Sequence, residues 1–307
     1  MIKQLHGFLA IWCVLLLTGC LDYGQQTLTY RYDAKSDTLR IFQVYQGIFG
    51  EDQPAGLSSK ELDQLQSVLV GQRTFFFANW ILEYNRDEVS NSLDRLTKPN
   101  AQQDAKRDPV IRSRQEAFLK LLLDNIRVEN GAFYLDGQGR LCGTQFVSVK
   151  QFSKLAAAAN VQIQDFLKAE AVRENVSVEE HDLFLKSIEQ PQTYIAVEGN
   201  QIRLRLPMTR AAFEKTYGPK SGSTKQLDEF KRQGGTFAFA DNEMKWSIGK
   251  PLDHTTELTL SVSDKPYVSN ALSEVKRRTV VREKMDLAAV SKAFIWGTNT
   301  MVNPSKP

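Results

Sequence analysis

Alternating apolar and polar positions predict β-strands that pair as hairpins along the chain. In residues 26–33, leucine and tyrosine share one face of a strand, while threonine and arginine share the other. A second strand at 38–45 follows a polar turn, so we expect the two to form an antiparallel hairpin. The Asn-Gly pair at 130–131 predicts another hairpin, because type I′ turns need positive φ at both central residues. A further hairpin is expected around Glu-Gly-Asn at 198–200.

Apolar residues at helical spacing lie between these strands. Ser58 and Glu61 form a capping-box signature, which predicts a helix over 58–71. A second helix is expected at 110–126, where isoleucine, phenylalanine and leucine recur on one face. Other helices are expected at 149–159, 162–173, 177–189, 208–217, 224–232, 266–277 and 285–294. Other strands are expected within 75–82 and at 140–147, 236–240, 244–248 and 256–262. Antiparallel hairpins interspersed with amphipathic helices predict an α+β fold.

An unbroken apolar run from Phe8 to Leu17 follows the positive charge of Lys3 near the N-terminus. As a helix, this run would span only about 15 Å, whereas a bilayer core needs roughly 20 apolar residues. The run therefore predicts a cleaved signal peptide and not a transmembrane helix. The alternatives are a secreted protein cut at another position and an apolar helix packed in the core.

The quartet Leu-Thr-Gly-Cys at 17–20 resembles the lipobox of bacterial lipoproteins, and the resemblance covers residues 1–20 only. It implies that Cys20 receives a diacylglyceryl group and that a peptidase cleaves between Gly19 and Cys20. Membrane lipid is then the expected partner through acylated Cys20, and two or three acyl chains would anchor the protein firmly in the cell envelope. Leu21 stands where that family's inner-membrane proteins have aspartate, which favours the outer membrane.

Polar residues bounded by prolines at 98–109 mark the expected boundary within the rest of the chain. Residues 21–26 are expected to be a short tether. Residues 128–135 and 197–204 share a similar pattern, which fits either a duplicated hairpin-helix unit or a chance match of turn chemistry. The expected divisions are a lipoprotein signal peptide at 1–19, a tether with an α+β segment at 20–97, an α+β region at 110–296 and a flexible tail at 297–307.

The composition is that of an ordinary globular chain, with 42% hydrophobic and 24% charged residues. Removing residues 1–19 leaves 288 of the 307 residues, enough for one large or two modest domains. The formal net charge falls from +3 to +2 when Lys3 is removed, which argues against a nucleic-acid partner. The basic cluster at 276–284 alternates with glutamates, so it is expected to be solvated surface.

Residues with catalytic or metal-binding side chains are sparse. After processing and acylation Cys142 would be the remaining cysteine, and in a predicted strand it fits a small buried hydrophobe better than a nucleophile. His181 and His254 are far apart and lack a His or Cys neighbour at metal-ligand spacing. The sequence contains no nucleophile elbow, phosphate loop or dinucleotide fingerprint. We therefore expect no metal, no cofactor and no recognisable catalytic residue.

Two short motifs allow competing interpretations. Asp-Gly-Gln-Gly-Arg at 136–140 superficially resembles a calcium loop, but it has too few acids, so a plain turn is favoured. Glu-Glu-His-Asp at 179–182 could raise the pKa of an imidazole or supply a general base. Acidic residues also favour helix N-termini through the helix dipole, so a helix cap is the favoured interpretation.

Aromatic side chains are the remaining candidates for binding, because their faces contact sugars and partner proteins, although core positions are more typical of them. The candidates are Trp80, Trp246, Trp296, Tyr23, Tyr30, Tyr32 and Tyr45. The anchor and the missing catalytic set favour a non-enzymatic binding or scaffolding module with a protein or glycan partner. The alternative is an envelope hydrolase that cuts glycan or peptide with two carboxylates about 5–9 Å apart. An exposed apolar patch would favour the first, and facing carboxylates across a groove the second.

Overall fold

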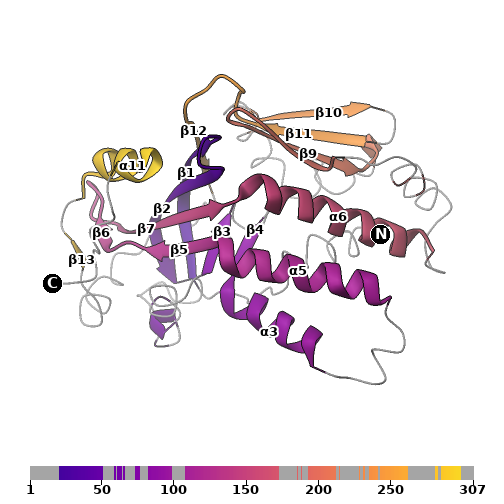
Figure 1. Cartoon of the computed structure of the whole chain (residues 1–307). Coiled ribbons are helices and arrows are strands. Elements are labelled where there is room, and N and C mark those ends of the chain that lie inside the picture. The colour runs from indigo at the N-terminus through magenta and orange to yellow at the C-terminus, as the bar shows by residue number, and fades with distance from the viewer. Residues whose placement is uncertain are drawn as a thin grey trace.

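The computed structural model describes a set of packed strands and helices that begins at Leu21 (Figure 1). The expected signal peptide and Cys20 lie outside the described residues, as do residues 99–107 and most of the helices expected at 177–189, 208–217, 224–232 and 266–277. The described residues are 21–50, 73–76, 82–98, 108–172, 193–211, 235–240, 243–261, 281–282 and 285–298, with isolated positions at 59, 61–63, 65, 185, 188, 214, 228 and 231.

The largest sheet in the described part of the chain has seven strands. Its order is β12-β1-β2-β7-β6-β13, and β5 also pairs with β7. All pairs are antiparallel except β13 with β6. β1 and β2 form the hairpin predicted for 26–33 and 38–45, through the turn at 34–37. The strands are β1 (Leu21–Asp33), β2 (Thr38–Gly50), β5 (Ile126–Asn130), β6 (Phe133–Leu135), β7 (Leu141–Lys150), β12 (Thr256–Ser261) and β13 (Val281–Arg282).

A four-stranded antiparallel sheet has the order β10-β11-β9-β8, and α6 contacts it through β8 (Figure 1). β8 and β9 form the hairpin predicted at 198–200, with Gly199 at φ 55° in its turn. A separate pair, β3 and β4, overlaps the two ends of the stretch at 75–82 predicted to be strand-like, and residues 77–81 between them lie outside the described residues. These strands are β8 (Ile195–Glu198), β9 (Gln201–Pro207), β10 (Thr236–Ala240), β11 (Glu243–Ile248), β3 (Arg73–Phe76) and β4 (Leu82–Asn85).

The helices differ from the prediction in two places. The helices expected at 149–159 and 162–173 are a single helix, α6, because that stretch contains no glycine or proline to end it. α3 was not predicted, because its sequence is mostly polar and its start is fixed by the Asn85 side chain, which accepts from the N–H groups of Asp87 and Glu88. None of the described helices is long and apolar enough to cross a membrane. The helices are α3 (Arg86–Thr97), α5 (Pro109–Asn125), α6 (Phe152–Ala171) and α11 (Leu287–Trp296).

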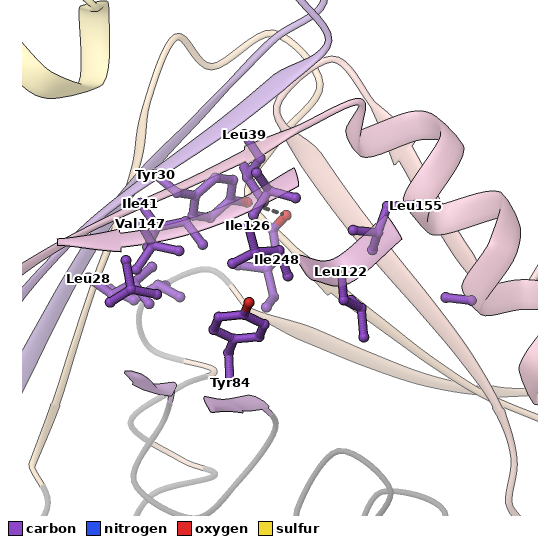
Figure 2. Close-up of a cluster of buried hydrophobic side chains, with 14 of the residues drawn as sticks. Leu28, Tyr30, Leu39, Ile41, Tyr84, Leu122, Ile126, Val147, Leu155 and Ile248 are labelled. Carbon is purple, nitrogen blue, oxygen red and sulfur yellow. Dashed lines mark hydrogen bonds between the residues drawn. The ribbon is translucent and has the colours of Figure 1, made fainter. Parts of the chain in front are cut away.

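The main hydrophobic cluster lies on one face of the large sheet, and Figure 2 shows its side chains meeting between strands and helices. β1 and β2 contribute alternate residues such as Leu28 and Ile41, α5 contributes Leu122 and α6 contributes Leu155. The small sheet contributes residues of β11, including Ile248. The cluster therefore combines residues from both of the segments expected at 20–97 and 110–296. Together with the pairing of the strands, it confirms the α+β class.

The hairpin expected at Asn130-Gly131 is wrong. β5 and β6 do not pair with each other, because both pair with β7. Asn130 pairs with Gln145 and Tyr134 pairs with Cys142. The chain therefore advances four residues from β5 to β6 while the paired part of β7 advances only three. This one-residue excess is a β-bulge. Residues 128–135 and 197–204 therefore differ in strand pairing, despite their similar sequences.

The tether expected at 21–26 is also wrong. Leu21 already pairs with Gly50, and the ladder of β1 with β2 continues to Asp33. Its first residues, Leu-Asp-Tyr-Gly, show no clear alternation of apolar and polar positions, so the local sequence does not predict a strand there. Pairing with the long strand β2 overrides that weak local pattern.

Candidate interaction surface

The Cys142 side chain is 0% exposed in β7, so the structure agrees with the buried-hydrophobe interpretation. Its thiol donates to the carbonyl oxygen of Arg140 at 3.4 Å. Burial raises the pKa of the thiol, which disfavours the thiolate that a nucleophile needs. A catalytic role for Cys142 is therefore not supported by its surroundings.

The loop at 136–140 is a plain turn, as favoured from the sequence. One carboxylate oxygen of Asp136 accepts from the backbone N–H groups of Gln138 and Arg140, each at 2.9 Å. The other accepts from Nε of Arg140 at 2.7 Å. Burial alone would raise the pKa of Asp136, but these hydrogen bonds lower it below its ordinary value. The carboxylate is thus engaged in closing the turn between β6 and β7.

The remaining titratable candidates do not come together in the described residues. His181 and the run at 179–182 lie outside them. His254 is exposed, in the loop between β11 and β12. Within the described ranges, no group of three histidine, cysteine, aspartate or glutamate side chains could hold a metal ion.

Most of the aromatic candidates within the described residues belong to the fold. Tyr30 and Tyr45 are buried, and Trp246 is buried in β11 with its ring stacked on Phe237 at 6.1 Å. Trp80 lies outside the described residues. In contrast to the buried Trp246, Trp296 is 42% exposed.

Trp296 is the last residue of α11, and the structure of that helix holds it at the surface. Asp286 caps the start of the helix by accepting from the N–H of Ala289 at 3.0 Å. Ile295, 1% exposed, packs into the core beside Phe42 and Phe146. Gly297 ends the helix at φ 65°, a left-handed conformation that suits glycine. The buried neighbour on one side and the tight cap on the other orient Trp296 outward.

The side chains of Arg31 and His254, from two other parts of the chain, contact the Trp296 ring. Cζ of Arg31, on β1, lies 4.5 Å from the ring centroid, which is a cation–π contact. The ring of His254 lies 6.1 Å away at 45°. Leu252, in the same loop as His254, is 92% exposed. We call Arg31, Leu252, His254 and Trp296 the Trp296 surface.

Charged side chains of both signs lie beside the Trp296 surface. Asp33 lies between Arg31 and Arg40, with nitrogen–oxygen distances of 3.9 Å to each. A hydrogen bond from Ser36 and the two arginines lower the pKa of Asp33, so it stays ionised. Arg31 therefore places a guanidinium group on an exposed aromatic ring, with Asp33 and Arg40 beside it and Asp253 in the loop between Leu252 and His254.

A buried polar network lies on the inner face of the large sheet, and the sequence analysis did not predict it. Gln43 is 0% exposed and accepts from Gln26 Nε2 at 2.7 Å and from the Tyr45 hydroxyl at 2.9 Å. Its own amide donates to Thr74 at 2.8 Å. The Tyr45 hydroxyl also lies 2.7 Å from Gln145 Oε1. These neutral groups are linked to one another by hydrogen bonds across three strands, so we assign them to fixing strand register and not to chemistry.

Comparison with known proteins assigns no family to the chain. No protein-family model, curated protein or solved structure matches it. The function is therefore inferred from the residues and their geometry.

The sequence identified Trp296 as a candidate, but it did not predict the contacts of Trp296 with Arg31 and His254. These contacts bring together three parts of the chain that are distant in sequence.

Proposed function

We propose that this chain is a bacterial envelope lipoprotein, anchored by lipid on Cys20, that works as a non-enzymatic binding or scaffolding module. The anchor rests on the order of Lys3, the apolar run and the lipobox-like quartet at 17–20. Cleavage before Cys20 would keep every residue of the described fold, because β1 begins at Leu21. Leu21 after the cysteine favours the outer membrane.

The exposure of Trp296 beside Arg31 is the observation that carries the binding role. Tryptophan and arginine are the residues most enriched among those that dominate protein–protein binding energy. The guanidinium group of Arg31 on the ring could pair with an acidic side chain of a protein partner. The hydrolase alternative stays a hypothesis. Among the described carboxylates, Asp37 accepts from the Ser153 hydroxyl at the start of α6, and Asp165 of α6 pairs with Arg114 at 2.9 Å, so both have structural roles.

The anchor is tested by metabolic labelling with a fatty-acid analogue. The wild type is expected to incorporate the label, and Cys20→Ser is expected to lose it. Cys13→Ser and Cys142→Ala are matched controls that should keep the label, because residue 13 leaves with the signal peptide and residue 142 is buried. Equal labelling of wild type and Cys20→Ser would contradict the proposal.

The binding surface is tested by photo-crosslinking in intact cells. A photoreactive amino acid at Leu252 should give a discrete crosslinked product, whereas the same group at Val110, which is 56% exposed on α5, should not. Trp296→Ala should abolish the product from position 252 while labelling at Cys20 persists. Crosslinking that survives Trp296→Ala would show that Trp296 carries no binding role.

A further inference from the structure

We infer that the lipid anchor joins the fold without a tether, so that one end of the large sheet faces the lipid surface and the Trp296 surface faces away from it. This inference rests on the proposed acylation of Cys20. Leu21, the next residue, is already paired with Gly50. Adjacent Cα atoms are about 3.8 Å apart. Residue 20, the proposed site of acylation, is therefore the direct chain neighbour of a residue in the strand ladder.

The strand that receives the anchor is firmly held. From Gln25 to Tyr30 β1 is paired on both sides, with Gln46 of β2 and Ser261 of β12 at Gln25. Near its start, Tyr23 packs edge-on against Tyr45 at 5.1 Å between ring centroids. A paired strand of this kind cannot swing as a flexible linker does, because bending it would break ladder hydrogen bonds.

The length of β1 separates two ends of the molecule. Its 13 residues, at about 3.4 Å each, span about 40 Å from Leu21 to Asp33. Arg31, which contacts Trp296, lies ten residues beyond Leu21 and therefore about 34 Å from the start of the strand. The Trp296 surface is thus placed for a partner in the aqueous compartment, not for membrane lipid.

Two exposed turns mark these ends and can carry probes. The turn at 136–140 leads into β7, where Cys142 pairs with Gln46, close to the start of β1. The turn at 34–37 joins β1 to β2 at the opposite end. Gln138 and Lys35 are both exposed. Cys142 is 0% exposed, so a cysteine introduced at either turn can be labelled selectively.

The experiment uses the full lipidated protein in vesicles of phosphatidylethanolamine and phosphatidylglycerol. A fluorophore is attached to Gln138→Cys or to Lys35→Cys, and headgroup-labelled quencher lipid is added. Quenching should be several-fold stronger at 138 than at 35. A flexible Gly-Ser linker inserted between Cys20 and Leu21 should reduce that difference, because the body could then tumble at the surface.

Flotation with the vesicles and the mass of the acyl groups are measured on the same samples. Equal quenching at 138 and 35 in a protein that is acylated and floats would overturn the orientation while leaving the lipoprotein proposal intact. A difference unchanged by the linker would overturn the role of the missing tether. A protein that neither carries acyl groups nor floats would overturn both proposals.

Discussion

The carboxylate of Asp37, in the turn between β1 and β2, connects that turn to the start of α6, which is far away in the sequence. It accepts from the Ser153 hydroxyl at 2.6 Å, from the Ser153 backbone N–H at 3.0 Å and from the Tyr32 hydroxyl at 2.8 Å. Its backbone carbonyl accepts from the N–H of Phe152 at 3.1 Å. The start of α6 is therefore capped by a residue in the β1–β2 turn, which substitutes for a cap within the helix.

Asp37→Ala should lower the free energy of unfolding by about 1–2 kcal/mol near neutral pH, as expected for a lost N-cap. Burial alone would raise the pKa of Asp37, but hydrogen bonds from Ser153 and Tyr32 lower it. Because the pKa of Asp37 is lower in the folded protein than in the unfolded chain, its carboxylate stabilises the fold at pH values above the ordinary pKa of about 3.9. That stabilisation is lost as the pH falls through the pKa of the folded state. The difference between wild type and variant should therefore shrink in acid, as measured by urea unfolding across pH.

Asp94→Ala is the matched control for Asp37→Ala, because Asp94 is exposed on α3. It should change the unfolding free energy by less than about 0.5 kcal/mol. A loss of equal size in both variants would show that the Asp37 contacts do not cap α6.

The bulge between β5 and β6 stands where Asn130-Gly131 predicted a hairpin turn. Asn-Gly favours a tight hairpin turn, yet glycine is also used where a backbone approaches closely. Here the N–H of Gly131 donates to the carbonyl of Thr144 at 2.8 Å. A Cβ on Gly131 would lie 2.0 Å from Oγ1 of Thr144, so glycine is required by proximity and not by a turn.

Gly131→Ala should therefore cost about 1–3 kcal/mol of stability, the usual range for overpacking. Adding Thr144→Ala should recover part of the loss, because it removes the oxygen that the new methyl group meets. Gly137→Ala, where a Cβ would meet nothing within 4 Å, is the matched control and should be near neutral. Thermal and denaturant unfolding of the single and double variants form the test. A double variant less stable than Gly131→Ala would contradict this steric account.

Elements with strong local signals were predictable, and the contacts between them were not. The β1–β2 and β8–β9 hairpins follow from alternation and turn residues, and α5 follows from its apolar face and the Asp108 cap. The polar helix α3 has only Val89, Leu93 and Leu96 at helical spacing, a weaker signal than the apolar face of α5. The Gln43 network and the Trp296–Arg31 contact depend on strand order and register, which single-sequence patterns do not specify.

At the scale of the whole molecule, a small polar junction connects the two larger sheets. The Tyr30 hydroxyl of β1 lies 2.9 Å from the carbonyl oxygens of both Asn200 and Ile248. Asn200 in turn accepts from the N–H of Tyr32 at 2.9 Å and donates to Thr256 at 2.8 Å. Tyr30 and Ile248 also belong to the shared hydrophobic cluster, visible together in Figure 2. Loosening this junction should therefore weaken both sheets at once.

Tyr30→Phe should lower the free energy of unfolding by about 2 kcal/mol, because buried carbonyls lose their donor. Far-UV circular dichroism and tryptophan fluorescence should still give one denaturant midpoint, since both sheets share the core. Burial raises the pKa of Tyr30 to about 12, so its neutral form stabilises the fold below pH 10, and that contribution is lost as the pH rises through about 12. The variant should lack this part of the stability loss at alkaline pH.

The matched control is Thr29→Val, which removes an exposed hydroxyl on β1 near Glu257 and should change the free energy of unfolding little. Separate midpoints for the two probes in Tyr30→Phe would mean that the sheets unfold independently and that the junction does not couple them.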